Sequence, residues 1–452
     1  MPLRRRLNPT KILLGGYAGI ILLGALLLML PWSRNGDLSP LDALFTSASA
    51  VCVTGLVVKD TATFYTLFGK AVIITLIQVG GLSYMTFATL FLFLVGRKGS
   101  LVVRSTMAAS YPDLSLGEVY RFARGIVVMA LAAEAVGFIL LSFPFVGRYG
   151  FPAGLGHAAF HAVSAFCNAG FSSFSDSLTT WRGDILVNLT LLWLIVMGGI
   201  GFVALDEYYN RFIRRRRRKL TLHGRMVAAM TIGLVLVGFV AFLAFEWTGA
   251  MADFPVREKI LSALFMSITP RTAGFNTLNY ASLSPFSLLL TTGLMIIGAS
   301  PGGTAGGIKT TALAVVFIRL MATLTGKHES SAFGYRIGAE AIRKAYAVFV
   351  LALFVVSGAL LLISLTDSEG MIIRGLLPYL FETASAFGTV GLSLGSFTVP
   401  NASLSADLSV LGKCIIIITM LIGRIGVLSL FMTFITPAHD LVRYVEGKVV
   451  IG

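Results

Sequence analysis

Long apolar segments alternate with short ones along this chain, and the alternation limits the possible folds more than any other feature. Crossing about 30 Å of hydrocarbon takes about 20 mainly apolar residues in a helix. Segments that approach or exceed this length lie at 12–31, 68–95, 122–145, 185–205, 226–247, 285–320, 345–365 and 408–436. Shorter runs lie between them at 40–51, 156–168, 258–269 and 374–387. These runs are too short to cross, so we interpret them as re-entrant segments.

The composition supports a membrane protein. Hydrophobic residues make up 56% of the chain and charged residues only 13%, against roughly 25% charged residues in an ordinary soluble domain. The sequence also lacks paired carboxylates or a nucleophile next to a base, which a catalytic site needs. We therefore expect a membrane protein that is not an enzyme and has no covalently bound cofactor.

The pattern of long, short and long segments occurs four times, and each short run ends in a similar phrase. The four phrases are Ser49-Ala-Val-Cys-Val-Thr-Gly55-Leu, Ser164-Ala-Phe-Cys-Asn-Ala-Gly170-Phe, Ile268-Thr-Pro-Arg-Thr-Ala-Gly274-Phe and Ser385-Ala-Phe-Gly-Thr-Val-Gly391-Leu. Their glycines are separated by 115, 104 and 117 residues. Repeats at a fixed period indicate one structural unit in several copies. We predict an all-α polytopic membrane protein with four pseudo-symmetric span–pore-helix–span repeats around one central pore, at 1–96, 97–210, 211–325 and 326–452.

Basic residues are distributed unevenly between the loops and predict the orientation. The net charge is +15, and 24 of the 36 Lys and Arg residues lie at the termini and between the repeats, against nine in the loops beside the short runs. By the positive-inside rule both termini are cytoplasmic, and the glycine phrases enter from the outer face. The basic cluster at 214–219 then indicates contact with anionic membrane lipid rather than with nucleic acid. A protein partner at this cluster is the alternative.

Four glycine phrases at membrane depth predict a cation pathway. Non-helical backbone is tolerated there only where it is buried in protein or lines a water-filled cavity. Rings of carbonyl oxygens can replace the hydration shell of K⁺, and glycine brings no Cβ into a crowded axis. The predicted filter residues, with K⁺ at their carbonyl oxygens, are Val53, Thr54, Gly55, Asn168, Ala169, Gly170, Thr272, Ala273, Gly274, Thr389, Val390 and Gly391.

The fourfold arrangement with glycines at 55, 170, 274 and 391 resembles the Trk/Ktr/HKT superfamily of potassium transporters, over essentially the whole chain. The first span begins near residue 12, without the additional N-terminal helices of the larger Trk subunits, so the chain looks most similar to the Ktr membrane subunits. The resemblance implies a homodimer with one pore per protomer in a bacterial-type plasma membrane. It also implies a cytoplasmic ring of nucleotide-binding RCK-type regulatory subunits. Glycine at all four filter positions is the pattern associated with K⁺ preference.

The second span of the third repeat is interrupted at 298–307, where one proline and five glycines disfavour a helix. A close-packing kink is one interpretation. The other is a flexible loop across the pore, and the resemblance implies that the matching stretch is an intramembrane gate. The predicted gate residues are Gly298, Pro301, Gly302, Gly303, Gly306, Gly307, Lys309 and Arg424.

Three basic residues, Arg271, Lys309 and Arg424, fall at neither aqueous face. A charged residue at membrane depth is a functional candidate by default. We expect Arg424 to help close the pore together with the 298–309 loop. A salt bridge to Glu134 or Glu382 is the alternative. Arg271 is expected to hold a filter loop by hydrogen bonds to carbonyl groups.

The predicted function is K⁺ uptake through a channel-like pore, with K⁺ as the transported ion. Each filter phrase carries one glycine rather than the longer TVGYG run of K⁺ channels, so we expect imperfect discrimination against Na⁺. A Na⁺-permeable or Na⁺-coupled transporter is one alternative. A non-conducting membrane anchor for cytoplasmic regulatory subunits is the other.

Overall fold

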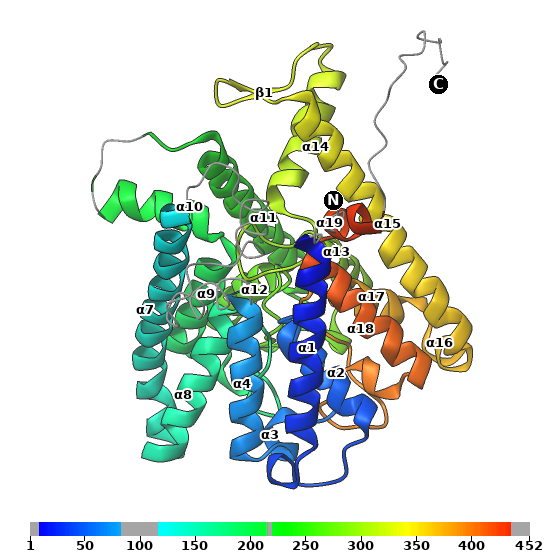
Figure 1. Cartoon of the computed structure of the whole chain (residues 1–452). Helices are drawn as coiled ribbons and strands as arrows, with labels where there is room; N and C mark the ends of the chain where they lie inside the picture. The colour runs from blue at the N-terminus through cyan, green and yellow to red at the C-terminus, as the bar shows by residue number, and fades with distance from the viewer. Residues whose placement is uncertain (1–8, 83–115, 214, 216–218, 435–452) are drawn as a thin grey trace, which may run out of the picture.

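The computed structural model describes residues 9–82, 116–213, 215 and 219–434 and is mostly helical (Figure 1). This confirms the helical class predicted from the sequence. The exception is a small antiparallel hairpin of strands β1 (Ser331–Ala332) and β2 (Tyr335–Arg336), which was not predicted.

The helices are grouped by the four regions that the sequence predicts as repeats, 1–96, 97–210, 211–325 and 326–452. The first two regions contain α1 (Pro9–Met29), α2 (Pro40–Val51), α3 (Thr61–Phe64), α4 (Leu67–Gly81), α7 (Leu116–Tyr149), α8 (Phe151–Phe166), α9 (Ile185–Gly199) and α10 (Phe202–Tyr208). The last two contain α11 (Leu222–Glu246), α12 (Val256–Ile268), α13 (Pro285–Ile296), α14 (Thr310–Leu324), α15 (Ala339–Thr366), α16 (Ser368–Arg374), α17 (Leu376–Gly388), α18 (Val410–Ile425) and α19 (Val427–Phe434). Single turns of 3₁₀-helix lie at Pro31–Ser33, Thr179–Trp181, Tyr280–Ser282 and Leu404–Asp407, and a π-helical segment lies at Tyr209–Ile213.

The helices that follow the glycine phrases all begin with the same kind of cap. In α4, α9, α13 and α18 a short polar side chain accepts a hydrogen bond from a backbone N–H in the first turn, and the capping residues are Thr66, Asp184, Ser284 and Ser409. Such caps satisfy amide groups that the helix itself leaves unpaired. The sequence thus fixes where each of these helices starts.

Several helices are long and apolar enough to cross a membrane. Within the described residues these are Ala123–Tyr149, Leu222–Glu246 and Ala339–Thr366, and two bent helix pairs also qualify when each pair is taken as one span. Their outward faces carry exposed apolar side chains, among them Phe143, Leu236 and Phe354. Exposed apolar surface of this extent fits contact with lipid rather than with water.

Two of the predicted spans are not straight helices, which corrects the expectation from the sequence. The pair α9 and α10 is bent by 107°, and α18 and α19 by 99°. The bends occur at Gly201 and Gly426, whose φ angles of 94° and 93° lie outside the helical region. The predicted third-repeat break is present between α13 and α14. Most of the second half of the predicted 68–95 span lies outside the described residues.

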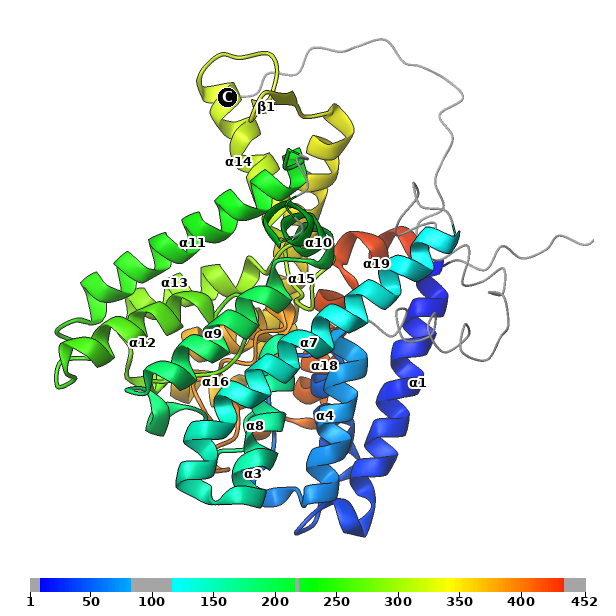
Figure 2. The ribbon, with the colours of Figure 1, turned by 90° about the vertical axis from the view of Figure 1, so that its left-hand side faces the viewer.

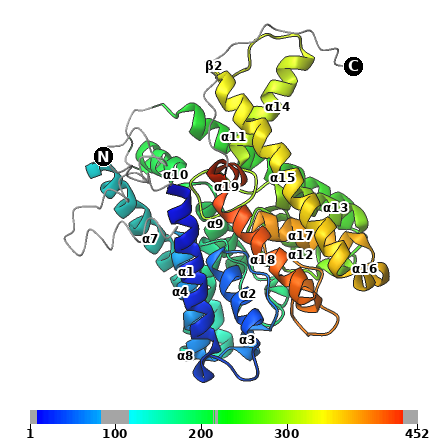
Figure 3. The ribbon, with the colours of Figure 1, turned by 45° about the vertical axis from the view of Figure 1, so that its right-hand side comes forward.

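The contacts between helices form a closed circle. Within the predicted repeats, the re-entrant helices α2, α8, α12 and α17 pack against the first helix of their own region. Between regions, α4 packs on α8, α9 on α12, α13 on α17, and α18 on α2 (Figures 2 and 3). Each helix after a glycine phrase therefore contacts the re-entrant helix of the next region, and the last region contacts the first.

A mostly buried ion pair reinforces the closure between the last and first regions. The Lys413 ammonium group on α18 lies 2.7 Å from a carboxylate oxygen of Asp42 on α2, and both side chains are 14% exposed. Nearby, the backbone N–H of Ser403 donates to the Val57 carbonyl at 2.8 Å. These contacts join segments that are more than 340 residues apart in the chain.

Candidate ion pathway

The four glycine phrases meet at the centre of the molecule, each directly after a buried helix C-terminus. The helices α2, α8, α12 and α17 end at Val51, Phe166, Ile268 and Gly388. In every phrase the glycine and the residue two positions before it have positive φ angles; the pairs are Val53 and Gly55, Asn168 and Gly170, Thr272 and Gly274, and Thr389 and Gly391. A positive φ is uncommon in non-glycine residues. The shared conformation gives the four phrases the same local backbone path.

The glycines approach one another in a ring. A Cβ atom on Gly55 would clash with the carbonyl oxygen of Ala169, and one on Gly170 would lie 3.0 Å from the carbonyl oxygen of Ala273. The ring continues in the same sense, with Gly274 against the Val390 carbonyl and Gly391 against the Thr54 carbonyl. Each glycine thus contacts the carbonyl group that precedes the next glycine. The twelve predicted filter residues are therefore brought together.

A hydroxyl group at the start of each phrase braces its backbone. The hydroxyl groups of Ser49 and Ser385 accept hydrogen bonds from the N–H groups of Gly55 and Gly391, both at 3.0 Å. In the other two phrases the hydroxyl groups of Ser164 and Thr269 donate instead to the carbonyl groups that follow the glycine, those of Phe171 and Phe275. These hydrogen bonds were not predicted. The sequence carries a signal for them, because the first, second and fourth phrases begin with serine and the third has threonine at its second position.

Replacing Ser385 with alanine is expected to loosen the fourth phrase. The change leaves the partly buried N–H of Gly391 without its acceptor, and the cost of a fully buried unsatisfied group, about 1–3 kcal/mol, is an upper bound for this effect. We expect a lower midpoint of thermal unfolding in detergent and a lower ratio of K⁺ to Na⁺ uptake. The matched control is Ser364→Ala on α15, whose hydroxyl group bonds only to the Leu361 carbonyl of its own helix. Equal behaviour of the two variants would refute the bracing role.

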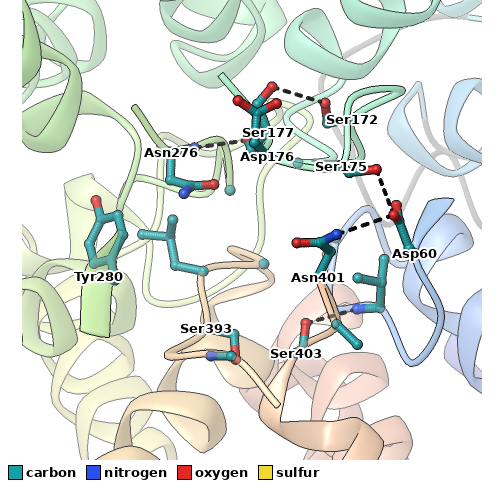
Figure 4. A pocket seen from close by; sticks show the side chains of 18 of the residues that line it. Asp60, Ser172, Ser175, Asp176, Ser177, Asn276, Tyr280, Ser393, Asn401 and Ser403 are labelled. Atoms are coloured by element: carbon teal, nitrogen blue, oxygen red, sulfur yellow. Dashed lines mark hydrogen bonds between the residues drawn. The ribbon is translucent and has the colours of Figure 1, made fainter. Parts of the chain in front are cut away.

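A hollow of about 490 Å³ opens above the glycine ring (Figure 4). All four glycines of the ring line its floor, and its wall is built from polar side chains of all four regions. Its described lining includes Asp60 and Asp176 and contains no Lys or Arg. We call this hollow the vestibule. A vestibule with acidic and without basic side chains attracts cations.

The two vestibule acids are held in place by hydrogen bonds. The Asp60 carboxylate accepts from the Ser175 hydroxyl at 2.6 Å and from the Asn401 side chain at 3.4 Å, so it links three regions (Figure 4). Burial raises the pKa of Asp176, but hydrogen bonds from Thr180 and Thr179 outweigh this effect and hold the pKa below its usual value. Asp176 therefore keeps its negative charge at neutral pH.

The segment between α13 and α14 forms a closed loop on the side of the ring away from the vestibule. Its ends meet, since Ile297 and Ile308 form a parallel bridge, and Gly307 has a φ of 66°. Its tip reaches the positive-φ residues that stand two positions before the glycine in two phrases. The backbone N–H of Gly306 donates to the Thr389 hydroxyl at 3.1 Å, and the Thr304 hydroxyl is 2.9 Å from the Asn168 side-chain amide. We call residues 298–309 the crossing loop.

The crossing loop also contacts the second region closely. The N–H groups of Ser300 and Thr304 donate to the carbonyl groups of Gly199 and Gly198, at 3.0 and 3.1 Å. A Cβ atom on Gly201 would clash with the Pro301 carbonyl, and the Gly302 carbonyl accepts from the Phe202 N–H at 3.1 Å. Gly298 packs against Gly306, and Gly303 lies against the Gly198 carbonyl. The predicted gate residues of the loop thus lie together beneath the ring.

Arg424 and Lys309 hold neighbouring carbonyl groups of the crossing loop. The Arg424 guanidinium donates to the carbonyl groups of Thr304, Gly80 and Gly81, so it bridges the loop to the first region. The Lys309 ammonium donates to the Ala305 carbonyl at 2.6 Å. Within the described part of the chain neither cation forms an ion pair. Two basic side chains therefore lie beside the loop, with no acidic partner among the residues that the structure describes.

The alternative of a salt bridge between Arg424 and a buried acid is wrong for the described residues. Both oxygens of Glu134 accept from the Gln78 side chain, at 2.9 and 3.1 Å. Glu382 accepts from the Ser405 N–H and hydroxyl, at 2.9 and 2.5 Å. Glu134 therefore joins α7 to α4, and Glu382 anchors the loop before α18 to the re-entrant helix α17.

The role expected for Arg271 is also wrong. Its side chain is buried, and it donates to the Thr231 hydroxyl on α11 at 3.4 Å rather than to a carbonyl group of the glycine phrases. Its Nε has no hydrogen-bond partner among the described residues. The spacing to Gly274 was a poor guide because the side chain points away from the ring, toward α11.

Three kinds of contributing residue were missed in the sequence. Thr304 is central to the crossing loop but resembles an ordinary loop residue. The vestibule acids Asp60 and Asp176 lie in outer loops, where a lone carboxylate carries no signal of its own. The glycines at the two helix bends, Gly201 and Gly426, could have been found, since each follows a long apolar run and matches the break seen in the third region.

The fold and the glycine ring define a class, the membrane-embedded cation transport proteins. The chain matches the TrkH family, described as cation transport protein, over residues 20–444. This chain belongs to that family, which is a class of transporters and not of enzymes. The resemblance seen in the sequence is thereby confirmed, and the chain is an integral membrane protein.

Relatives and a solved structure agree with this assignment. The chain is 38% identical to the Ktr system potassium uptake protein B of Bacillus subtilis over 99% of this chain and 97% of that protein. It is 34% identical to the potassium/sodium uptake protein NtpJ of Enterococcus hirae over 99% and 98% of the two chains. The crystal structure of the potassium transporter TrkH from Vibrio parahaemolyticus superposes with a TM-score of 0.73 at 18% identity, covering 96% of this chain and 86% of that chain.

Proposed function

We propose that this chain takes up K⁺ across the plasma membrane through a channel-like pore formed by four pseudo-symmetric repeats. The observation that carries the proposal is the glycine ring, in which each glycine lies against the carbonyl group that precedes the next one. Side chains larger than hydrogen would not fit at these positions. Four backbone segments can therefore surround one axis closely enough for their carbonyl oxygens to replace the water of a permeating cation.

The charges around the ring favour a cation. Four helices end at the ring, and the C-terminus of a helix carries a partial negative charge. The acids Asp60 and Asp176 add negative charge in the vestibule. K⁺ is the cargo in this proposal, and the twelve residues of the four phrases bind it through their backbone.

The gate is the crossing loop together with Arg424. The loop lies beneath the ring, and its hydrogen bonds to the second and fourth regions give it a defined closed position. Arg424 in turn links the loop to the first region through the Gly81 carbonyl. Loss of these bonds would let the loop move aside. A positive charge next to a cation pathway raises the barrier to conduction, so Arg424 opposes conduction while it stays bonded to the loop.

The proposed assembly is built on the repeats and is supported by the relatives. The repeats extend over 1–96, 97–210, 211–325 and 326–452, with both termini cytoplasmic. The start of α1 and the helix α19 lie at the same end of the molecule (Figure 1), which supports an even number of crossings. We propose a homodimer that binds a cytoplasmic ring of nucleotide-binding RCK-type subunits, as the resemblance seen in the sequence implies. The names of the relatives with 38% and 36% identity, which belong to Ktr systems, support a partnership with other subunits.

A Na⁺-permeable transporter is the second candidate, and the name of the Enterococcus hirae relative favours it. Reconstitution of the full chain into liposomes with inward gradients of K⁺ or Na⁺ separates the candidates. We expect K⁺ flux that exceeds Na⁺ flux, with protein-free liposomes as the control. Equal fluxes would favour the Na⁺-permeable transporter. The absence of any cation flux, with or without cytoplasmic subunits, would leave only a membrane anchor.

A further inference from the structure

A second hollow, of about 750 Å³, lies at the vestibule end of the molecule, where α7, α9 and α12 come together. Its lining carries three arginines from three different segments, Arg148, Arg182 and Arg257, together with Trp181, Asp184 and Glu258. We call it the arginine hollow. The segments on this side of the molecule contain few basic residues, so three arginines at one hollow are a concentration of charge.

The acids of the arginine hollow are already engaged. The Asp184 carboxylate caps α9 by accepting from the Val187 N–H at 2.9 Å. Glu258 is paired with Arg182, with Oε2 and Nε 2.8 Å apart. The remaining two guanidinium groups have no acidic partner among the described residues and keep free N–H donors.

Both free guanidinium groups are held in position. The Arg257 side chain donates to the Gly183 carbonyl at 2.9 Å. The Arg148 guanidinium stacks over the Trp181 ring, 5.1 Å from its centre. Guanidinium groups fixed in this way can bind a phosphate group through several donors at once.

The arginine hollow borders the apolar surface that faces lipid. Phe143 and Phe151 beside Arg148 are 70% and 71% exposed, and Val256 next to Arg257 is 59% exposed. Tyr149, which is 38% exposed, adds an amphipathic aromatic side chain of the kind enriched at membrane–water interfaces. A ligand with a phosphate group and acyl chains would fit both the charge and the apolar border, whereas a free anion would use only the charge.

We propose that the arginine hollow binds the headgroup of an anionic phospholipid of the outer leaflet. The phosphate group is held by Arg148 and Arg257, and the acyl chains lie along the exposed apolar side chains beside them. Binding there would stabilise the neighbouring turn, because Thr179 lines both the hollow and the vestibule and bonds to Asp176 at 2.7 Å. The lipid would thus support one wall of the vestibule.

The test uses the delipidated full chain in detergent, titrated with dioctanoyl phosphatidylglycerol while the midpoint of thermal unfolding is followed. We expect the wild type to be stabilised by this lipid and not by dioctanoyl phosphatidylcholine. The double variant Arg148→Gln/Arg257→Gln should need about tenfold more lipid for the same shift, because it loses charge-assisted hydrogen bonds. The control Arg34→Gln removes an arginine from the same end of the molecule and should titrate like the wild type. All variants keep the basic cluster at 214–219, so lipid bound at that cluster contributes equally to every titration.

Several results would overturn the proposal. They are equal stabilisation by the two lipids, an unchanged titration of the double variant, or the same shift with inorganic phosphate, which would make the hollow a site for free anions. If the double variant does not fold, the single variant Arg148→Gln is titrated with the same lipid instead. It leaves the hydrogen bond from Arg257 to the Gly183 carbonyl intact. That variant must then bind the lipid more weakly than the wild type.

Discussion

Replacing Gly55 with serine is expected to reduce the discrimination of K⁺ from Na⁺ by about tenfold or more. The φ of Gly55 is 92°, and its Cβ would clash with the Ala169 carbonyl. A non-glycine residue in such a conformation stores about 1–3 kcal/mol of strain, and a tenfold change corresponds to about 1.4 kcal/mol. The backbone relieves the strain by moving carbonyl groups away from the axis. Parallel K⁺ and Na⁺ flux measurements in liposomes give the ratio.

The control for this prediction is Gly156→Ser. Gly156 lies in α8, and a Cβ there would meet open space. Both variants should first be shown to elute as folded protein, so that a lower flux is not a result of lower yield. If Gly55→Ser keeps the wild-type ion ratio, the ring does not select the ion.

Replacing Arg424 with alanine is expected to raise K⁺ flux in the absence of any activating partner by about tenfold. Two effects act together. The crossing loop loses its link to the carbonyl groups of Gly80 and Gly81, and the pathway loses a positive charge. A unit charge about 10 Å from an ion contributes roughly 1.7 kcal/mol at an effective dielectric constant of 20, which corresponds to slightly more than a factor of ten in rate. Flux from liposomes containing the chain alone measures the change.

Two further variants separate the causes of the Arg424 effect. Arg424→Lys keeps the positive charge but loses the guanidinium group, which donates both to the crossing loop and to the first region. We therefore expect a flux between those of the wild type and Arg424→Ala. Arg343→Ala removes an exposed charge near the start of α15 and should leave the flux unchanged. An Arg424→Ala variant that folds and conducts no better than the wild type would remove Arg424 from the gate.

The re-entrant helices could be predicted closely because their limits depend on local sequence. The run 40–51 has the same bounds as α2, since Ser39 caps the helix and Pro40 occupies its first position. The meeting of the four glycine phrases was predictable in the same way, because a repeat in the sequence imposes the same path four times. Local signals and repetition therefore account for most of the fold and for the position of the candidate filter.

The remaining features depend on contacts between distant segments. The bend at Gly201 coincides with the approach of the crossing loop, whose Pro301 and Gly302 carbonyl groups face it, and no pattern within α9 indicates that approach. The partner of Arg271 was mispredicted for the same reason, since Thr231 lies on a neighbouring helix. Hydrogen-bond partners of a buried charge are set by the packing of several helices.

The closed circle of helix contacts has a consequence for how the protein is made. The first glycine phrase has one neighbour in the second region, but its other neighbour arrives only with α17 and α18, and the ion pair that closes the circle joins residues 371 positions apart. Because the chain is synthesised from its N-terminus, three quarters of it must enter the membrane before any ring can close. A chain released early would carry unpaired backbone groups inside the bilayer, each at a cost of several kcal/mol, so the open ring would be the least stable part of an incomplete chain.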